Sequence, residues 1–158
     1  MRQSKPTYYW DASLFLAWLM NESSKPGEME GLAEVAWLVD RNQAIIVTSV
    51  MTKGEVWQSA LPVNVRVMFA DVFKRPNVVL VDLSDPISAL GGVIREDYAS
   101  RHAKLKLADA QHLATAIACK VTEFHTFDEN DLIAKSGNVA GYKLIICKPK
   151  GVQGILQL

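Results

Sequence analysis

The feature that most constrains this chain is an alternation of short apolar runs with longer segments whose apolar residues recur at helical spacing. The run Ala-Ile-Ile-Val at 44–47 is continuous, as in parallel strands that are covered on both faces. The pattern predicts strands at 7–10, 44–47, 78–83, 121–126 and 143–147. It predicts helices at 14–20, 28–41, 63–74, 105–119 and 128–135, one that follows Ser49 and ends near Ala60, and one that begins after Ser84. The expected fold is therefore α/β, a three-layer α/β/α sandwich around a central, mainly parallel five-stranded sheet.

Size and composition indicate one soluble domain. The chain has 158 residues, 49% of them hydrophobic, which suits a single domain over 1–158 with a core at about 7–147. The longest candidate membrane segment, 12–20, is shorter than the ~20 apolar residues that a spanning helix needs. Cys119 and Cys147 are too few for a disulfide scaffold, lack the spacing of a zinc site, and are expected in the core. We expect a cytoplasmic protein without membrane contact.

The charge balance gives no direct sign of a nucleic-acid partner. Lysine and arginine together number 17, as do aspartate and glutamate, so the formal net charge is zero. Any contact with phosphate must come from local basic patches, although each patch alone is better explained as a solvated surface. The best candidates for RNA contact follow the Gly91-Gly92 pair: Arg95, Arg101, Lys104 and Lys106.

Acidic residues follow the predicted strands. Ligands of such folds bind beyond the carboxyl ends of the strands, so these positions are candidates for a site. Asp11 directly follows the first strand, and Glu55 lies one to two helical turns after the second. Asp109 is near the start of an apolar helix, and Asp128 follows the fourth strand. All four carboxylates can lie at one end of the sheet.

Each acid also has a structural explanation. Asp11 and Asp128 can cap the helices that follow them, Thr52-x-x-Glu55 matches a capping box, and Asp109 suits the first turn of a helix. The combination is harder to explain this way, because every acid has apolar neighbours, where an unpaired carboxylate is costly.

The acids around Asp11 and Glu55 also lack an obvious cationic partner. The single nearby cation, Lys53, is two residues from Glu55 and off its helical face. Converging carboxylates repel one another, and a divalent cation removes that repulsion. Ligands that are all oxygen suit Mg²⁺ or Mn²⁺, and such a site is typical of phosphodiester cleavage.

Four blocks of sequence carry a resemblance to a known family. They are Tyr9-Trp10-Asp11-Ala12-Ser13, Thr48-Ser49 leading to Gly54-Glu55-Val56, Leu107-Ala108-Asp109-Ala110-Gln111-His112-Leu113-Ala114-Thr115-Ala116, and Thr126-Phe127-Asp128. Their order and spacing over about residues 7–146 resemble the PIN domain, and within it the VapC-type ribonuclease toxins. The third block is the most specific. The resemblance implies a PIN-like sheet with a parallel core and a Mg²⁺- or Mn²⁺-dependent endoribonuclease that cuts single-stranded RNA. It also implies the role of a toxin, with a cognate antitoxin and a homodimer as expected partners.

The resemblance also implies residue roles. The metal ligands and catalytic acids would be Asp11, Glu55, Asp109 and Asp128. Asp131 is an additional or substitute acid in the corner of Asp128, and Thr126 is the small hydroxyl residue beside it. Ser13, from its position two residues after Asp11, either hydrogen-bonds a ligand or phosphate or caps the first helix. Either Asp109 or Asp128 would orient the attacking water or accept its proton.

Other polar and aromatic residues are weaker candidates. His112 lies one helical turn from Asp109 and could contact the site, although a lone histidine on a helix is more often packed or exposed. Trp18 and Trp37 fall on apolar helical faces, so we expect them in the core rather than stacked on RNA bases.

Two alternatives to the toxin remain. One is a housekeeping PIN nuclease without an antitoxin, and the other is a PIN-like module that binds RNA or a protein without cutting. The complete set of acids argues against the second. A nucleotide-binding protein of the same architecture has no support, because neither GxGxxG nor GxxxxGK[ST] occurs in the sequence.

Overall fold

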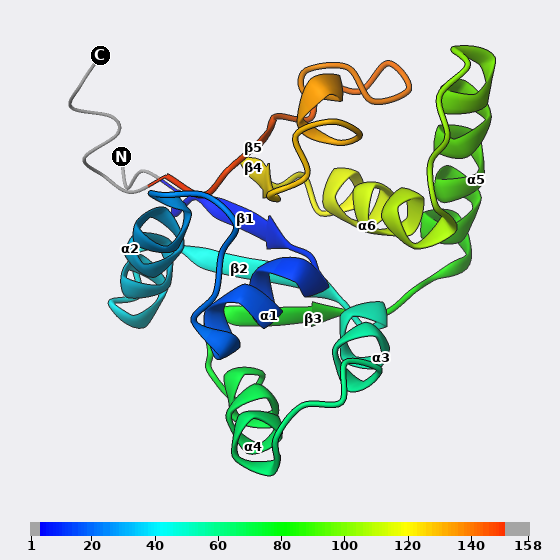
Figure 1. Ribbon diagram of the computed structural model, residues 1–158. Coiled ribbons are helices and arrows are strands. Elements are labelled where there is room, and N and C mark those ends of the chain that lie inside the picture. Colours follow the sequence, from blue (N-terminus) through cyan, green and yellow to red (C-terminus); the bar gives the residue numbers. More distant parts are fainter. Residues whose placement is uncertain (1–3, 151–158) are drawn as a thin grey trace.

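The computed structural model describes residues 4–150 and contains one five-stranded sheet with helices on both faces (Figure 1). The strands are β1 (Thr7–Trp10), β2 (Ile45–Ser49), β3 (Val78–Val81), β4 (Glu123–His125) and β5 (Ile146–Cys147). The helices are α1 (Ala12–Met20), α2 (Glu28–Asp40), α3 (Met51–Trp57), α4 (Val63–Val72), α5 (Asp85–Ser100) and α6 (Leu107–Ala118), with a 3₁₀ turn η1 (Ile133–Lys135). The ends of the predicted domain, 1–3 and 151–158, lie outside the described residues.

The order of the strands reverses beside β1. The sheet runs β3-β2-β1-β4-β5, and every neighbouring pair is parallel, so the predicted α/β fold is confirmed. From β1 the chain builds β2 and β3 on one side, then returns through α5 and α6 to add β4 on the other. The direction of winding therefore reverses between β1 and β4. In open α/β sheets, ligands bind beyond the carboxyl ends of the strands at such a point.

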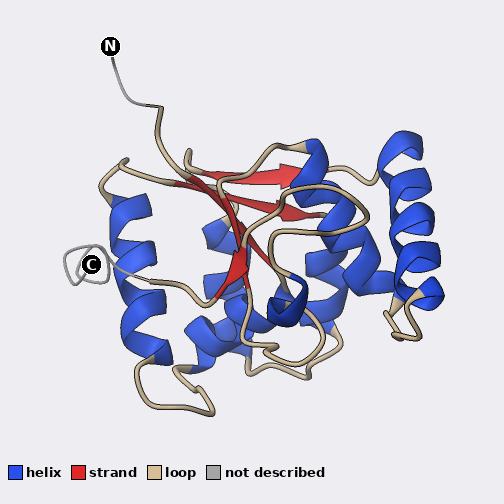
Figure 2. Cartoon of the chain, turned by 90° about the horizontal axis from the view of Figure 1, so that it is seen from above, coloured by secondary structure: helices blue, strands red, loops and turns tan. Residues whose placement is uncertain are grey.

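Two apolar cores flank the sheet because successive side chains of a strand point to opposite faces. Trp10 and Ile46 pack in the core under α1, α2 and α4. Their neighbours in sequence, Tyr9 and Val47, pack with Phe124 in the core under α5 and α6. Figure 2 shows the twisted strands with helices at either side. Adjacent residues of β1 thus contribute to both cores: Trp10 points to the side of α1, and Tyr9 points to the side of α6.

Several local expectations needed correction. The fifth strand was predicted at 143–147, but the observed strand contains only Ile146 and Cys147. The segment before it forms other contacts: Val139 and Tyr142 form a β-bridge, and the Gly137 N–H donates to the Leu144 carbonyl. The helix predicted at 128–135 is confined to the 3₁₀ turn at its end.

The predicted core positions of two side chains, Trp37 and Cys147, were also wrong. Trp37 is 50% exposed, because the buried stripe of α2 runs through Leu32, Val35, Ala36 and Val39, and the Arg41 guanidinium lies 4.3 Å from the centre of the Trp37 ring. Cys147 is half-buried and belongs to neither core. Cys119 is also half-buried, but it packs against the core under α5 and α6, as predicted. Trp18 does pack against the core under α1. Within residues 4–150, no helix combines the length and the apolar character that crossing a membrane requires.

Candidate metal centre

Asp11 lies at the carboxyl end of β1 and is also the N-cap of α1. Its Oδ1 accepts hydrogen bonds from the Leu14 N–H at 3.3 Å and from the Ser13 hydroxyl at 2.5 Å. The residue is 8% exposed. Asp11 therefore caps α1 and also lies at the carboxyl end of β1. Asp11 Oδ2 accepts no hydrogen bond from any residue that the structure describes.

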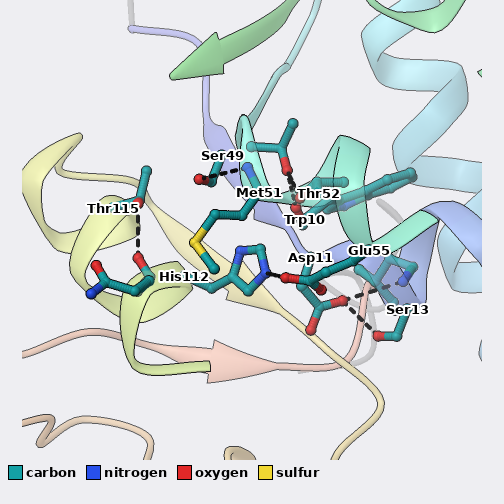
Figure 3. Close-up of polar contacts among 12 residues, drawn as sticks. Trp10, Asp11, Ser13, Ser49, Met51, Thr52, Glu55, His112 and Thr115 are labelled. Atoms are coloured by element: carbon teal, nitrogen blue, oxygen red, sulfur yellow. Dashed lines mark hydrogen bonds and ion pairs between the residues drawn. The ribbon is translucent and has the colours of Figure 1, made fainter. Parts of the chain in front are cut away.

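Glu55 is positioned by the way α3 is fixed to the ends of β1 and β2. The Thr48 hydroxyl donates to the Trp10 carbonyl at 2.7 Å and shares a 2.7 Å hydrogen bond with the Thr52 hydroxyl. Ser49 Oγ accepts from the Met51 N–H that begins the helix. Thr52 is thus engaged by Thr48, and no capping box forms with Glu55. One turn later, Glu55 Oε1 meets His112 Nε2 at 2.7 Å (Figure 3).

Asp109 and Asp128 complete the acidic group from α6 and from the loop after β4. Asp109 is in the first turn of α6 and is half-buried. Asp128 Oδ1 accepts from the Asp131 N–H at 3.0 Å, and Thr126 Oγ1 accepts from the Asp128 N–H at 3.2 Å. Thr126 is buried beside the acid, as predicted, whereas Asp131 is exposed. Asp131 therefore supports Asp128 through its backbone.

The pKa values of the acids show that their charges act on one another. Burial raises the pKa of Asp11, against the hydrogen bond from Ser13, and the charge of Glu55 raises it further. The pKa of Asp109 is raised by burial first and then by Asp11, with Asp128 adding to the effect and Lys106 opposing it. Ionised acids at this end of the sheet are thus under-compensated by the protein's own cations.

The donor set fits a divalent cation of the Mg²⁺ or Mn²⁺ type. Its members are carboxylates, and a buried group of like charges is stabilised by a cation. Glu55 and Asp11 each have one oxygen held by a protein donor, and their second oxygens accept no hydrogen bond from the described residues. The carboxylate oxygens of Asp11, Glu55 and Asp109 do not all lie within 4.8 Å of one another. Within residues 4–150, the one group of three ligand-type side chains with donor atoms within 4.8 Å is Glu123, His125 and Cys147.

That second group is a closed hydrogen-bonded cluster rather than a metal site. The Trp10 indole N–H donates to His125 Nδ1 at 3.2 Å, so the imidazole proton is on Nε2 and donates to Glu123 Oε2 at 2.8 Å. The Cys147 thiol is 3.4 Å from the same oxygen, and burial followed by the charge of Glu123 raises its pKa to about 12. A metal would need a thiolate and a free lone pair on His125 Nε2. In this arrangement both are engaged by protons.

The predicted RNA-contact residues are exposed on α5 and on the loop that leads to α6. Arg95, Lys104 and Lys106 line one hollow together with Ala99, Ala103 and Leu105. Arg101 lies 3.2 Å from Asp97 and is partly neutralised by it. Lys106 is close enough to Asp109 to lower its pKa, so this hollow adjoins the acidic group.

Two residues of the site were not assigned to it from the sequence. His112 was only a weak candidate, yet it is 1% exposed and pairs with Glu55. Tyr9 was read as part of a strand, and its hydroxyl is 2.6 Å from His112 Nδ1. The available signal was positional: Tyr9 precedes Asp11 by two residues, and His112 follows Asp109 by one helical turn.

Comparisons with known proteins agree with this architecture. A family profile described as the PIN domain matches residues 8–136. Among solved structures, the Rickettsia felis VapBC2 complex bound to a promoter DNA fragment is similar over 89% of this chain and 96% of its own, with a TM-score of 0.65 and 14% identity. A Klebsiella pneumoniae toxin–antitoxin complex matches over 94% and 100%, with a TM-score of 0.59 and 20% identity.

A third similar structure is Mycobacterium tuberculosis VapC20, described as a toxin that cleaves the sarcin-ricin loop. It matches over 78% of this chain and 91% of its own, with a TM-score of 0.57 and 15% identity. At these identities the likeness concerns the fold. A search of curated protein sequences finds no significant match.

Proposed function

Because the chain belongs to the PIN domain family, we propose that it is a Mg²⁺- or Mn²⁺-dependent endoribonuclease that cuts single-stranded RNA. The observation that carries the proposal is the pair Asp11 and Asp109, whose pKa values are raised by burial and, for Asp109, next by the charge of Asp11. These acids lie at the reversal point of the sheet, where such folds bind their ligands. A divalent cation is the ligand that best relieves that repulsion.

The proposed roles follow from the positions of the acids. Asp11, Glu55 and Asp109 would hold the ion, with Asp128 as the fourth acid. Asp128 is preferred to Asp131 because its charge acts on Asp109, whereas Asp131 is exposed. A bound Mg²⁺ or Mn²⁺ would polarise a phosphate oxygen and lower the pKa of a coordinated water. Asp109 or Asp128 would orient the attacking water or accept its proton. Arg95, Lys104 and Lys106 would contact the phosphates of the RNA.

The decisive experiment compares wild type with Asp11→Asn on single-stranded RNA, in Mg²⁺, in Mn²⁺ and in EDTA. Asparagine caps helices about as well as aspartate, so the variant removes the charge and keeps the acceptor for Leu14 N–H. The matched control is Asp71→Asn. Asp71 lies on α4 and forms an exposed ion pair with Lys74. We expect cleavage by wild type and the control only, and only with metal. Cleavage by Asp11→Asn or in EDTA would overturn the proposal.

The toxin role rests on the similar structures, which include toxin–antitoxin complexes. We propose that the chain is the toxin of such a pair, restrained in the cytoplasm by a cognate antitoxin, and that it forms a homodimer. The alternative with the same chemistry is a housekeeping nuclease without an antitoxin. A small adjacent gene for a DNA-binding protein whose co-expression relieves growth arrest supports the first. Expression of the active enzyme without growth arrest supports the second.

A further inference from the structure

His112 is a buried histidine whose two ring nitrogens both form hydrogen bonds. It lies on α6 with 1% of its surface exposed, and its two ring nitrogens contact two different elements. Nδ1 is 2.6 Å from the hydroxyl of Tyr9 on β1, and Nε2 is 2.7 Å from Oε1 of Glu55 on α3. The imidazole therefore bridges the central strand β1 and helix α3, which carries Glu55. Figure 3 shows the contact with Glu55.

The hydrogen bonds around His112 fix where its proton is. The Ser49 backbone N–H donates to Tyr9 Oη at 3.2 Å, and a phenol keeps its proton at neutral pH. That proton is donated to His112 Nδ1. The neutral imidazole then carries its hydrogen on Nε2, and a carboxylate can only accept it. Burial lowers the pKa of His112, but the hydrogen bond to Glu55 raises it overall, and the protonated imidazole also donates from Nε2 to Glu55. The bonds form one directed chain from Ser49 through Tyr9 and His112 to Glu55.

Figure 3 shows the last bond of this chain, from His112 to Glu55, beside Asp11, whose carboxylate is held by Ser13. The Ser13 hydroxyl holds Asp11 Oδ1, and His112 holds Glu55 Oε1, so each acid has one oxygen fixed by the protein. The other oxygen of each acid is left without a hydrogen bond from the described residues. Glu55 needs such a constraint more than Asp11, because its longer side chain has more rotamers and is only half-buried.

We propose that His112 is a positioning residue for the metal site: held by Tyr9, it fixes Glu55 through Oε1 so that Oε2 faces the cation. This inference rests on the proposed function, because it assumes that Glu55 is a ligand. Hydrogen-bond partners of metal-binding side chains commonly govern affinity, and their removal weakens binding about 10–100-fold. His112 contacts Glu55 and not the RNA in this proposal. Its loss should therefore weaken the binding of the metal and leave the affinity for RNA nearly unchanged.

The test is a calorimetric titration of the purified chain with Mn²⁺, in the absence of RNA. His112→Leu replaces the imidazole by an apolar side chain without a donor, whereas His112→Gln keeps an N–H donor near the place of Nε2. We expect His112→Leu to bind Mn²⁺ about 10–100-fold more weakly than wild type, and His112→Gln to recover most of the loss. The KM for RNA at saturating Mn²⁺ should stay close to the wild-type value in both variants.

Tyr9→Phe keeps the inference testable if the His112 variants do not fold. It preserves the ring that stacks on Phe124 and removes only the hydroxyl that orients His112, so Mn²⁺ affinity should fall between those of wild type and His112→Leu. Circular dichroism and melting curves of each variant establish folding. Wild-type Mn²⁺ affinity in the folded His112→Leu protein, or in Tyr9→Phe, would overturn the inference.

Asp11→Asn separates this failure from failure of the proposed function. If wild type binds Mn²⁺ and Asp11→Asn does not, the metal site stands and the His112 variants alone decide the positioning role. If Asp11→Asn binds Mn²⁺ as tightly as wild type, the metal site itself is wrong and the role of His112 falls with it.

Discussion

Asp11 combines two tasks whose energetic requirements conflict. As the N-cap of α1 it is favoured by its hydrogen bonds, but as a buried carboxylate beside Glu55 it is costly to ionise. The second effect is the larger, because the net change in its pKa is upward. A residue that destabilises the chain that contains it, at a position where Asn would cap equally well, is typical of a functional site.

The raised pKa of Asp11 predicts that Asp11→Asn stabilises the protein in EDTA. The folded state holds the Asp11 proton more firmly than the unfolded state, so stability is lost as pH rises from the ordinary pKa of 3.8 through the folded pKa. At pH 7 the full penalty applies to wild type and is absent from Asn. The variant should therefore melt at a higher temperature than wild type at pH 7, by roughly 2–4 °C for each kcal/mol of penalty that it removes in a domain of this size.

The comparison of melting curves at pH 3 and pH 7 checks this sign. Near pH 3 Asp11 is protonated in both states, and the two proteins should melt at similar temperatures. A lower melting temperature for Asp11→Asn at pH 7 would mean that the carboxylate is compensated by the protein itself. The argument for a cation would then lose its main support.

Thr48 is a second residue whose hydroxyl can be tested. Its donation to the Trp10 carbonyl satisfies a buried backbone acceptor and anchors α3. Thr48→Val conserves the shape of the side chain but leaves that carbonyl unpaired, so we expect a loss of about 1–3 kcal/mol in the free energy of unfolding. Thr48→Ser retains the hydroxyl and should lose less. Urea unfolding of both variants measures the difference, and an unaffected Thr48→Val would contradict the anchoring role.

At the scale of elements, α5 and α6 are held together by a close approach that depends on glycine. A Cβ at Gly91 would lie 2.8 Å from the side-chain amide of Gln111, which is buried and contacts Ser88. Gly92 has open space at the same point. Adjacent positions of one helix thus differ in whether a methyl group can be accommodated.

Alanine substitutions at the two glycines should therefore have opposite effects. Gly92→Ala should stabilise the chain by up to ~1 kcal/mol, because alanine is the better helix former. Gly91→Ala gains the same propensity but forces Gln111 to move, and overpacking typically costs about 1–3 kcal/mol. Thermal or urea unfolding measures both. The double variant Gly91→Ala with Gln111→Ala should regain much of the loss, and equal stability of the two single variants would contradict the steric argument.

Elements were predicted correctly where their own residues determine the structure, and incorrectly where contacts with other segments do. The run Ile45–Val47 was recognisable as a strand from its own composition. Leu144 and Ile145, just before Ile146, are also apolar, but the Leu144 carbonyl accepts a hydrogen bond from the Gly137 N–H, and the strand contains only Ile146 and Cys147. Trp37 was predicted on the buried face of α2, but its ring is exposed and lies against the guanidinium of Arg41, one turn later. The sequence pattern alone does not show this contact.

For the whole molecule, zero net charge means that contact with RNA depends on where the cations lie. Arg95, Lys104 and Lys106 share a hollow next to Asp109, and this arrangement lets a neutral protein present a basic surface at its site.

Removing Lys104 and Lys106 should weaken RNA binding and its salt dependence together. Each lost phosphate contact lowers the slope of log K against log salt by about 0.7 for a single strand. Fluorescence anisotropy in the Asp11→Asn background measures binding without cleavage. Lys120→Ala, at the opposite end of α6, is the control and should leave the slope unchanged. A slope that is unaffected in the Lys104→Ala, Lys106→Ala variant would exclude the hollow as a phosphate-binding surface.

The site was predictable to the extent that strand ends are. Asp11 and Asp128 could be placed at one edge because parallel strands end together, and Asp109 because its helix precedes β4. The pairing of His112 with Glu55 could not be placed, since it joins residues 57 apart and depends on how α3 packs against α6. The sequence pattern locates the acids, whereas the contacts that hold them arise only from tertiary packing.

The central position of β1 has a consequence for the order of events during synthesis. β1 is made well before one of its two neighbours in the sheet, β4, which begins at Glu123, and the bond from Trp10 to His125 spans 115 residues. The acids proposed to hold the ion come from both ends of that interval. A growing chain therefore cannot assemble them until the segment that contains Asp128 has left the ribosome, so chains that stop before it would be inert.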